Sequence, residues 1–202
     1  MLSSPSFSTA RLRFRATEKS DAPFFHEMYS DEATMFAAMG NPPSPYGKGR
    51  SEAFVASVEK SLLNVIAFLP SRTLEEEEIA VGWACLSQRF PGSSHLNANF
   101  GLSLHPKHQG KGYGKEIMEW LLEMAFQRFN LHRIEGEVFS WNEPAIKIYK
   151  SCGFVQEGRR REAMYQEGEY RDDLIFGLLK HEWRAAHPEK LKPVQKTAEP
   201  EA

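Results

Sequence analysis

Three glycines alternate with other residues between Gln109 and Gly114, directly before a stretch with helical periodicity. The first amides of a helix have no acceptor within the helix, and the helix dipole favours negative charge at that end. Glycines let a bulky anion approach the backbone without meeting a β-carbon. Residues 109–114 therefore predict a binding site for a phosphate-bearing ligand, and a diphosphate fits best.

Two well-known phosphate-binding motifs do not match this segment. The pattern G-x-x-x-x-G-K-[ST] is absent, because Lys115 is followed by Glu116 rather than by a magnesium-binding hydroxyl. The dinucleotide pattern G-x-G-x-x-G is absent too. A glycine-rich turn that only joins two elements is the alternative. The strand stop at Pro106 and the helix that follows favour a binding role.

A second group of candidate residues lies on a short helix predicted after Asn142. Tyr149 follows Asn142 by seven residues, so a helix places both side chains on one face. A phenol stays protonated at neutral pH and can donate a proton to a leaving group. Each residue also has a structural interpretation, Asn142 as the helix N-cap and Tyr149 as a packed core tyrosine.

Candidate proton acceptors lie on other elements. The strand before the glycines has no carboxylate between Asn97 and Ser103. Glu135 and Glu137 share one face of the strand predicted at residues 133–140, and His105 stands at the end of the earlier strand. Any of the three could act through water, and each also has a structural interpretation, so the base stays open.

Other chemistries are weaker. Pro106 separates His105 from His108 and no third ligand is evident, so no metal is expected. Cys152 lies near a helix C-terminus, which disfavours a thiolate, so a nucleophilic cysteine is not expected. The charged runs at 75–78 and 159–161 are typical of solvated hairpin faces and do not decide a substrate.

The elements that must position these residues alternate between β and α. Hydrophobic periodicity predicts strands at 10–16, 65–70, 79–87, 96–104, 133–140, 154–164 and 173–180. It predicts helices after an N-cap at Thr17, at 53–63, from 110–114 to 129, and from Asn142 to Gly153. The segment 40–47 holds three prolines and must be an irregular loop. The fold class is therefore α/β (α+β), with one strand-helix-strand unit in the middle.

The composition of the 202 residues is that of an ordinary globular domain, with 41% hydrophobic and 26% charged residues. The net charge of −2 gives no field that would gather nucleic acid or an anionic membrane. The longest apolar stretch, 62–69, is far shorter than the roughly 18 residues of a membrane span. Two isolated cysteines fit a reducing compartment, and we expect a cytoplasmic protein. Arg11, Arg13 and Arg15 suit a mitochondrial presequence superficially, but their alternation with apolar residues favours a strand.

Two of these segments together resemble the GNAT superfamily of acetyl-CoA-dependent N-acetyltransferases. Gln109, Gly112 and Gly114 match its diphosphate signature [QR]-x-x-G-x-[GA], and residues 142–154 match its N-x-x-A-x-x-x-Y-x-x-x-G-F segment. Residues 101–106 resemble its splayed central strand. The opening around residues 11–15 and the helix start at 20–22 are similar to the branch that contains the ribosomal-protein N-terminal acetyltransferases.

The resemblance implies a GNAT fold, which is a mixed, mostly antiparallel central sheet with splayed central strands and flanking helices. It implies acetyl-CoA as cosubstrate, no metal, and Tyr149 as the group that protonates the departing sulfur. The cofactor-binding residues that it implies are Leu102, Leu104, Gln109, Gly110, Lys111, Gly112, Tyr113, Gly114 and Asn142. Leu102 and Leu104 would hold the pantetheine arm through backbone groups.

The expected activity is transfer of an acetyl group to a primary amine by direct attack. The acceptor is a protein N-terminus by the branch resemblance or else a small amine, and a homodimer stays open. A CoA-binding sensor or scaffold without turnover is the alternative, favoured by the missing central-strand carboxylate and disfavoured by Tyr149. We expect an N-terminal extension at 1–9, the GNAT domain at 10–183 and a disordered tail at 184–202. The loop at 40–49 is expected to shape the acceptor site.

Overall fold

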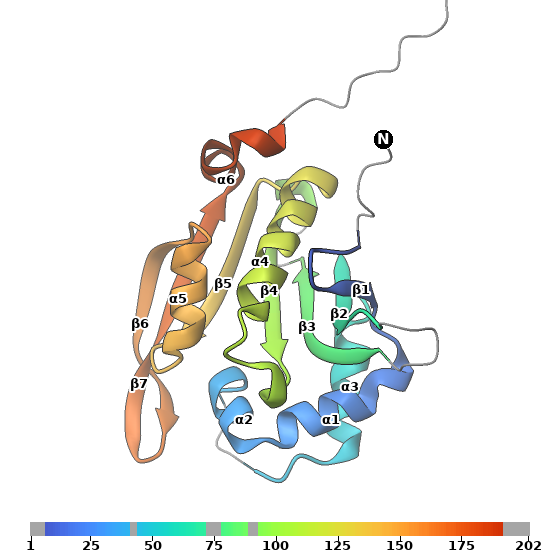
Figure 1. The fold of residues 1–202 in the computed structure, drawn as a ribbon. Coiled ribbons are helices and arrows are strands. Elements are labelled where there is room, and N and C mark those ends of the chain that lie inside the picture. The colour runs from blue at the N-terminus through green and yellow to red at the C-terminus, as the bar shows by residue number, and fades with distance from the viewer. Residues whose placement is uncertain (1–6, 41–43, 72–77, 89–92, 192–202) are drawn as a thin grey trace, which may run out of the picture.

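The computed structural model describes residues 7–40, 44–71, 78–88 and 93–191. A single sheet runs through the molecule, with helices on both faces (Figure 1). The strands are β1 (Arg13–Ala16), β2 (Leu63–Leu69), β3 (Ile79–Ser87), β4 (Asn97–Leu104), β5 (Arg133–Phe139), β6 (Val155–Gln166) and β7 (Glu169–Leu179). The helices are α1 (Ala22–Ser30), α2 (Glu32–Ala38), α3 (Lys48–Val58), α4 (Tyr113–Glu123), α5 (Glu143–Ser151) and α6 (Lys180–Ala186). Short 3-10 turns lie at 19–21, 93–95, 106–108 and 188–191, and a π-helical turn at 124–128 extends α4.

The strand order in the sheet is β1-β2-β3-β4-β5-β7-β6. All neighbouring strands are antiparallel except β4 and β5, which are parallel and joined through α4. Their pairing covers only Asn97–Asn99 against Arg133–Glu135. Beyond these residues the two strands separate, which confirms the predicted fold class with its splayed central strands. β4 and β5 thus leave a gap between them after Asn99 and Glu135.

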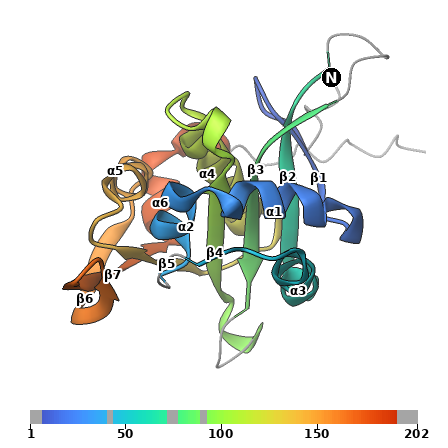
Figure 2. The ribbon, with the colours of Figure 1, turned by 90° about the horizontal axis from the view of Figure 1, so that it is seen from below.

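The two faces of the sheet carry different helices. Ile134 and Val138 of β5 pack in one core cluster with residues of α4 and with Tyr149 of α5. Alternate strand residues point to opposite faces, so Glu135 and Glu137 face the other side. On that side α1 and α3 cover β2 and β3 through a second cluster that includes Phe25. Figure 2 shows α3 on the face opposite α4 and α5.

The N-terminal prediction is correct in outline and wrong in detail. The expected strand at 10–16 is shortened to β1, because Thr9 and Leu12 close a turn before it (Thr9 N to Leu12 O, 2.8 Å). Thr17 is not the N-cap of α1. Its hydroxyl instead donates to the side chain of Asn64 (3.0 Å), and Asp21 occupies the capping position.

The C-terminal boundary also differs from the prediction. Residues 184–191, expected in a disordered tail, continue α6 and form a 3-10 turn. Lys190 pairs with Glu123 of α4 (2.8 Å), and its ammonium lies over the ring of buried Trp183 (5.8 Å). A few anchoring contacts therefore hold a segment that has little apolar sequence of its own. The rest of the expected tail, residues 192–202, lies outside the described residues.

The two predicted hairpins are confirmed. β2 and β3 pair in antiparallel register, and of the acidic run 75–78 only Glu78 belongs to the described residues. β6 and β7 are longer than predicted, and Glu167 and Gly168 form their turn with φ of 51° and 86°. Two successive positive φ values are typical of the tight turns that match the twist of a hairpin.

Candidate active site

The glycine-rich segment lies where β4 ends and α4 begins. Gly110 and Gly112 adopt left-handed conformations, with φ of 71° and 82°, which other residues adopt at a cost. Gly114 is buried, and a β-carbon there would lie 3.0 Å from Ile148 of α5 and 3.4 Å from Leu104 of β4. The glycines thus turn the chain and let α4 approach its neighbours. Gln109, Gly110, Lys111 and Gly112 remain exposed, and Tyr113 is half-buried.

The segment offers backbone amides rather than free cations. The amide of Glu116 is the first of α4 with a helical acceptor, the carbonyl of Gly112 (3.3 Å). The preceding amides are available to an anion, and the dipole of α4 adds favourable potential there. Lys111 donates to the carbonyl of Lys107 (2.7 Å), and Lys115 lies 3.6 Å from Glu119. Because both ammonium groups have partners in the protein, these lysines would weaken the repulsion of a bound anion more than they would contact it.

Gln109 connects the segment to two other elements. Its side-chain nitrogen donates to the carbonyl of Leu104 and to the hydroxyl of Thr34 in α2, both at 3.2 Å. The side chain therefore braces the end of β4 against α2. The sequence indicated Gln109 only as part of a binding motif, and its structural role depends on a residue 75 positions away.

The open edge of β4 faces the gap. The amide of His105 donates to the carbonyl of Val81 in β3 (2.9 Å). Successive residues of a strand direct their backbone groups to alternate sides, so Leu102 and Leu104 direct theirs away from β3. Their side chains pack against the core under α4. Leu102 thus presents its backbone groups to the space that β5 leaves, and Leu104 presents its amide, while the Leu104 carbonyl already accepts from Gln109.

Tyr149 lies beside the point where β4 and β5 part. Its ring is 8% exposed and packs edge-on against Phe100 of β4, with ring centroids 5.0 Å apart. Phe100 in turn covers Gly136 of β5, where a β-carbon would overlap its ring. Within the described residues the Tyr149 hydroxyl makes no hydrogen bond, and burial raises its pKa above the ordinary value of 10. The phenol therefore stays protonated at neutral pH.

Asn142 performs the capping role that its residue type allows. Its side-chain oxygen accepts from the amide of Ala145 (3.2 Å), and its nitrogen donates to the carbonyl of Ala37 in α2 (3.0 Å). The neighbouring Trp141 donates to the carbonyl of Phe36 (3.1 Å). The start of α5 is thus tied to the end of α2. Asn142 caps α5 and Tyr149 lies within it. Among the described residues the Asn142 side chain has two hydrogen-bond partners and the Tyr149 hydroxyl has none.

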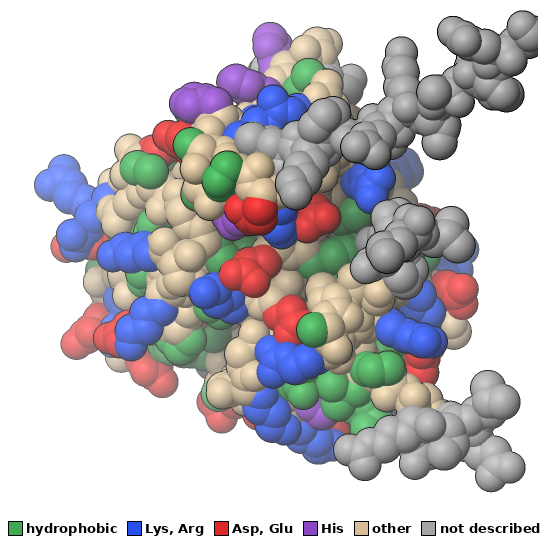
Figure 3. Space-filling model, turned by 45° about the horizontal axis from the view of Figure 1, so that its top comes forward, with side chains coloured by type: hydrophobic (Ala, Val, Ile, Leu, Met, Phe, Trp, Pro, Cys, Tyr) green, Lys and Arg blue, Asp and Glu red, His purple; other side chains and the backbone are tan. Residues whose placement is uncertain are grey.

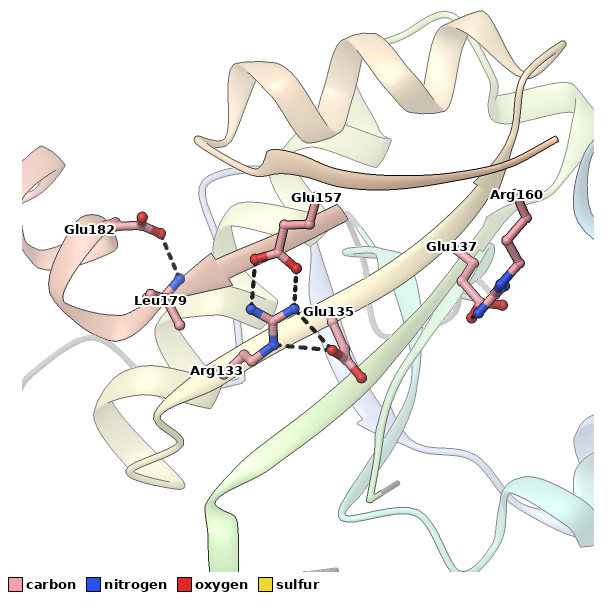
Figure 4. A network of polar contacts seen from close by, with 7 residues as sticks. All are labelled: Arg133, Glu135, Glu137, Glu157, Arg160, Leu179 and Glu182. Carbon is pink, nitrogen blue, oxygen red and sulfur yellow. Dashed lines mark hydrogen bonds and ion pairs between the residues drawn. The ribbon is translucent and has the colours of Figure 1, made fainter. Parts of the chain in front are cut away.

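The two candidate carboxylates of β5 are both in ion pairs (Figure 4). Glu135 lies 3.0 Å from Arg133, which also forms a two-bond pair with Glu157 of β6. Glu137 lies 2.8 Å from Arg160, which also binds Asp173 at 2.6 Å. These ion pairs hold both carboxylates in place on β5. Both face away from Tyr149, so an acid and a base could act from opposite sides of the sheet.

His105 is less suitable as a base than the sequence indicated. The ring is 6% exposed, and its Nδ1 accepts from the amide of Lys107 (3.3 Å). The proton of the neutral ring then lies on Nε2, which is 3.4 Å from Glu27. Both ring nitrogens are occupied. The described residues hold no group of three His, Cys, Asp or Glu side chains that could bind a metal.

The remaining sequence candidates lie apart from the gap or at its border. Burial raises the pKa of the Cys152 thiol, which lies at the end of α5. In the loop expected at 40–49, Gly40 packs against Phe139 and Met164, while residues 41–43 lie outside the described residues. A groove of about 770 Å³ runs along the outer side of α4, lined by residues 8–11 among others, and does not coincide with the gap.

On the face shown in Figure 3, Lys and Arg side chains are interspersed with Asp and Glu side chains rather than gathered in one basic area. None of the helices in the described ranges is long and apolar enough to span a bilayer.

Comparison with known proteins agrees with the geometry. Residues 11–155 match the family model described as acetyltransferase (GNAT) domain. A spermidine N(1)-acetyltransferase of Vibrio cholerae is 37% identical over 89 residues, which are 44% of this chain and 51% of that protein. The uncharacterized N-acetyltransferase YnaD of Bacillus subtilis is 27% identical over 176 residues, 87% of this chain and 98% of that one. The chain spans about half the length of the first curated relatives that it matches.

A solved structure extends the likeness to the fold. The spermidine N-acetyltransferase of Vibrio cholerae in complex with CoA and spermine superposes with a TM-score of 0.73 at 24% identity. The superposition covers 87% of this chain and 99% of that one. This likeness concerns the arrangement of the strands and helices.

Proposed function

Because the chain belongs to the acetyltransferase (GNAT) family, we propose that it transfers the acetyl group of acetyl-CoA to a primary amine. The observation that carries the proposal is the gap between β4 and β5. Backbone groups of Leu102 and Leu104 face it, the first amides of α4 at its mouth have no acceptor within the helix, and Tyr149 lies where the strands part.

The residues around the gap fit acetyl-CoA. The amides of residues 110–114 would receive the diphosphate, and Gln109 keeps this loop braced against β4. Leu102 and Leu104 would pair with the amides of the pantetheine arm as an added strand. Asn142, at the N-terminus of α5, would contact the same ligand while it caps the helix. When bound, acetyl-CoA supplies a thioester, whose carbonyl carbon is the site of attack.

Tyr149 supplies the proton that the departing sulfur needs. Attack by the amine forms a carbon–nitrogen bond and breaks the carbon–sulfur bond, which leaves a thiolate. The Tyr149 hydroxyl has no partner among the described residues and a raised pKa, so it holds its proton until a stronger acceptor appears. Solvent then restores the proton.

The nitrogen of the acceptor must also lose a proton. Glu135 and Glu137 lie on the opposite face of the sheet from Tyr149, and water would relay the proton to one of them. Replacing each by Gln tests this step. Loss of the acidic limb of the pH–rate profile in one variant identifies the base, with Glu157→Gln as a control that also perturbs an ion pair. An unchanged profile in both variants removes the carboxylates of β5 from this role.

The acceptor is a small amine or a protein N-terminus. Relatives named as spermidine acetyltransferases favour a small amine. The opening segment of the chain, with its similarity to ribosomal-protein N-terminal acetyltransferases, favours a peptide. We place a small polyamine first, because named relatives act on one. Association into a homodimer stays a prediction, which light scattering would check.

Release of free thiol tests the proposed function. The protein is incubated with acetyl-CoA and with polyamines, amino acids or N-terminal peptides, and the acetylated product is identified by mass spectrometry. We expect thiol release that depends on the amine and matches the product in amount. Tight binding of CoA without release for any acceptor would instead indicate a sensor or scaffold.

A further inference from the structure

Arg11 contacts the glycine-rich loop and the helix that follows it. Its Nη1 donates to the carbonyl of Lys111 (3.1 Å), and its Nε donates to Glu116 of α4 (2.6 Å). Its guanidinium also lies 4.7 Å from the centre of the Tyr113 ring. From its sequence pattern Arg11 is predicted to lie in the first strand, but β1 begins only at Arg13. No motif pairs it with a loop 100 residues away.

We propose that Arg11 is a positioning residue for the diphosphate of acetyl-CoA. It fixes the direction of one loop amide, that of Gly112, and neutralises the carboxylate of Glu116 in the first turn of α4. This inference rests on the function proposed above and assigns a role to a residue outside the glycine-rich motif.

The first part of the role follows from the planarity of the peptide bond. In a trans peptide the carbonyl of one residue and the amide of the next point in opposite directions. Arg11 holds the carbonyl of Lys111, so the amide of Gly112 must point away from Arg11. Gly112 has no β-carbon to restrict its backbone, so without this contact the peptide would have more conformations available. Arg11 thus keeps one loop amide directed outward before the ligand arrives.

The second part concerns charge. Glu116 lies in the first turn of α4, where its carboxylate would repel a bound diphosphate. Its Oε1 accepts from the hydroxyl of Thr9 (2.5 Å) and from the amide of Arg11 (3.1 Å). Its Oε2 lies 2.6 Å from both Nε and Nη2 of Arg11. The carboxylate is therefore turned toward the N-terminal segment and paired with a positive charge.

The N-terminal segment can hold Arg11 in place because it is anchored on α4. Leu12 is 1% exposed, and the ring of Phe14 stacks on Trp120 of α4 with centroids 3.7 Å apart. The turn from Thr9 to Leu12 is closed by a backbone hydrogen bond. Because the backbone at Arg11 is fixed, the side chain loses less conformational entropy when its guanidinium binds the loop.

A pair of acetyl donors separates positioning from folding. Acetyl-CoA carries the diphosphate, whereas S-acetylpantetheine carries the same thioester and pantetheine arm without it. We expect Arg11→Ala to raise the KM for acetyl-CoA about tenfold, since a charge-assisted contact of this kind is worth roughly that factor when half-exposed. The kcat with acetyl-CoA, and kcat/KM with S-acetylpantetheine, should stay within about twofold of wild type.

Two further variants sharpen the test. Arg11→Lys keeps the charge beside Glu116 but lacks the fork that reaches Lys111, so an intermediate KM is expected. Arg13→Ala is the matched control, because that side chain is 66% exposed and lies 4.0 Å from Glu78. It should behave as wild type with both donors. Arg11→Lys also provides a folded variant if Arg11→Ala does not fold.

Three results would overturn the inference. An equal loss with both donors in Arg11→Ala and Arg11→Lys would mean that Arg11 only supports the fold. A KM for acetyl-CoA that matches wild type in both variants would remove the positioning role while the proposed function stands. A wild-type protein that neither binds CoA nor releases thiol would refute the proposed function itself, and this role with it.

Discussion

Replacing Tyr149 by Phe removes one oxygen from the centre of the proposed mechanism. The phenyl ring keeps the packing against Phe100, Phe154 and Phe176 that places residue 149 beside the gap. The hydroxyl makes no hydrogen bond within the described residues, so its loss leaves no partner unsatisfied. The variant is therefore close to a test of the chemistry alone.

The size of the effect follows from these contacts. Because no hydrogen bond is broken, the free energy of unfolding should change by less than about 1 kcal/mol. Loss of a general acid lowers the chemical step by typically 10²- to 10⁴-fold. We expect kcat to fall by at least about a hundredfold, and the affinity for CoA, which depends on α4 and β4, to stay within about twofold.

Thiol release at saturating acetyl-CoA and amine measures kcat, calorimetry with CoA measures binding, and thermal unfolding monitors the fold. Tyr165→Phe is the control, since Tyr165 is 54% exposed on the β6–β7 hairpin. A kcat of Tyr149→Phe within twofold of wild type, when chemistry limits the rate, would refute the assigned role. A fall in kcat that accompanies a lowered melting temperature would assign Tyr149 to packing instead.

Three further predictions concern the same region. Burial raises the pKa of Tyr149 above 10, and the phenol loses its proton only above that pKa, so the rate should not fall below pH 10 because of Tyr149. An alkaline fall in rate below pH 10 that Tyr149→Phe abolishes would contradict the raised pKa. Gly136→Ala would place a β-carbon against the Phe100 ring and should lower the free energy of unfolding by about 1–3 kcal/mol, measured by denaturant titration. Gly49→Ala in α3 is the control, because open space surrounds that position, and it should be neutral or stabilising; equal effects of the two changes would show that β5 tolerates the β-carbon. Asn142→Ala should lower the free energy of unfolding by about 0.5–2 kcal/mol, whereas Asn142→Asp should keep the helix cap and lose only the hydrogen bond to the carbonyl of Ala37. Calorimetric unfolding of both variants separates the two contributions, and equal losses would show that the hydrogen bond to α2 matters more than the cap.

Local sequence signals predicted most of the sheet and the main helices. The alternation in β4 and β5, the glycines before α4 and the turn at Gly168 are patterns that depend on residues close in sequence. The strand-helix-strand unit between β4 and β5 required parallel strands, and the structure has them. Such elements could be predicted because the conformational preferences of their residues and the alternation of buried and exposed positions indicate the same secondary structure.

The contacts that position the site could not be read from the sequence. Gln109 binds Thr34, and Asn142 binds Ala37, over separations that no periodicity encodes. Thr17 had the residue type of an N-cap, but tertiary pairing with Asn64 prevailed. The segment after Trp183 is expected to be disordered because it lacks apolar residues, yet contacts of Lys190 with Glu123 and Trp183 and the stacking of His187 on Trp183 hold it.

The base shows the same limit. Glu135, Glu137 and His105 were equal candidates by residue type and strand position. Their partners distinguish them, because both ring nitrogens of buried His105 are occupied, whereas Glu135 and Glu137 lie in ion pairs on the strand that borders the gap. The partners that lie far away in the sequence, Glu27 of α1 for His105 and Arg160 of β6 for Glu137, could not be read from it.

A crystal structure of the protein with bound CoA tests the central claim most directly. The account predicts the diphosphate within hydrogen-bond distance of the amides of residues 110–114, the pantetheine arm along Leu102 and Leu104, and the sulfur beside the Tyr149 hydroxyl. CoA seated instead in the groove along the outer side of α4, with the gap between β4 and β5 empty, would contradict it.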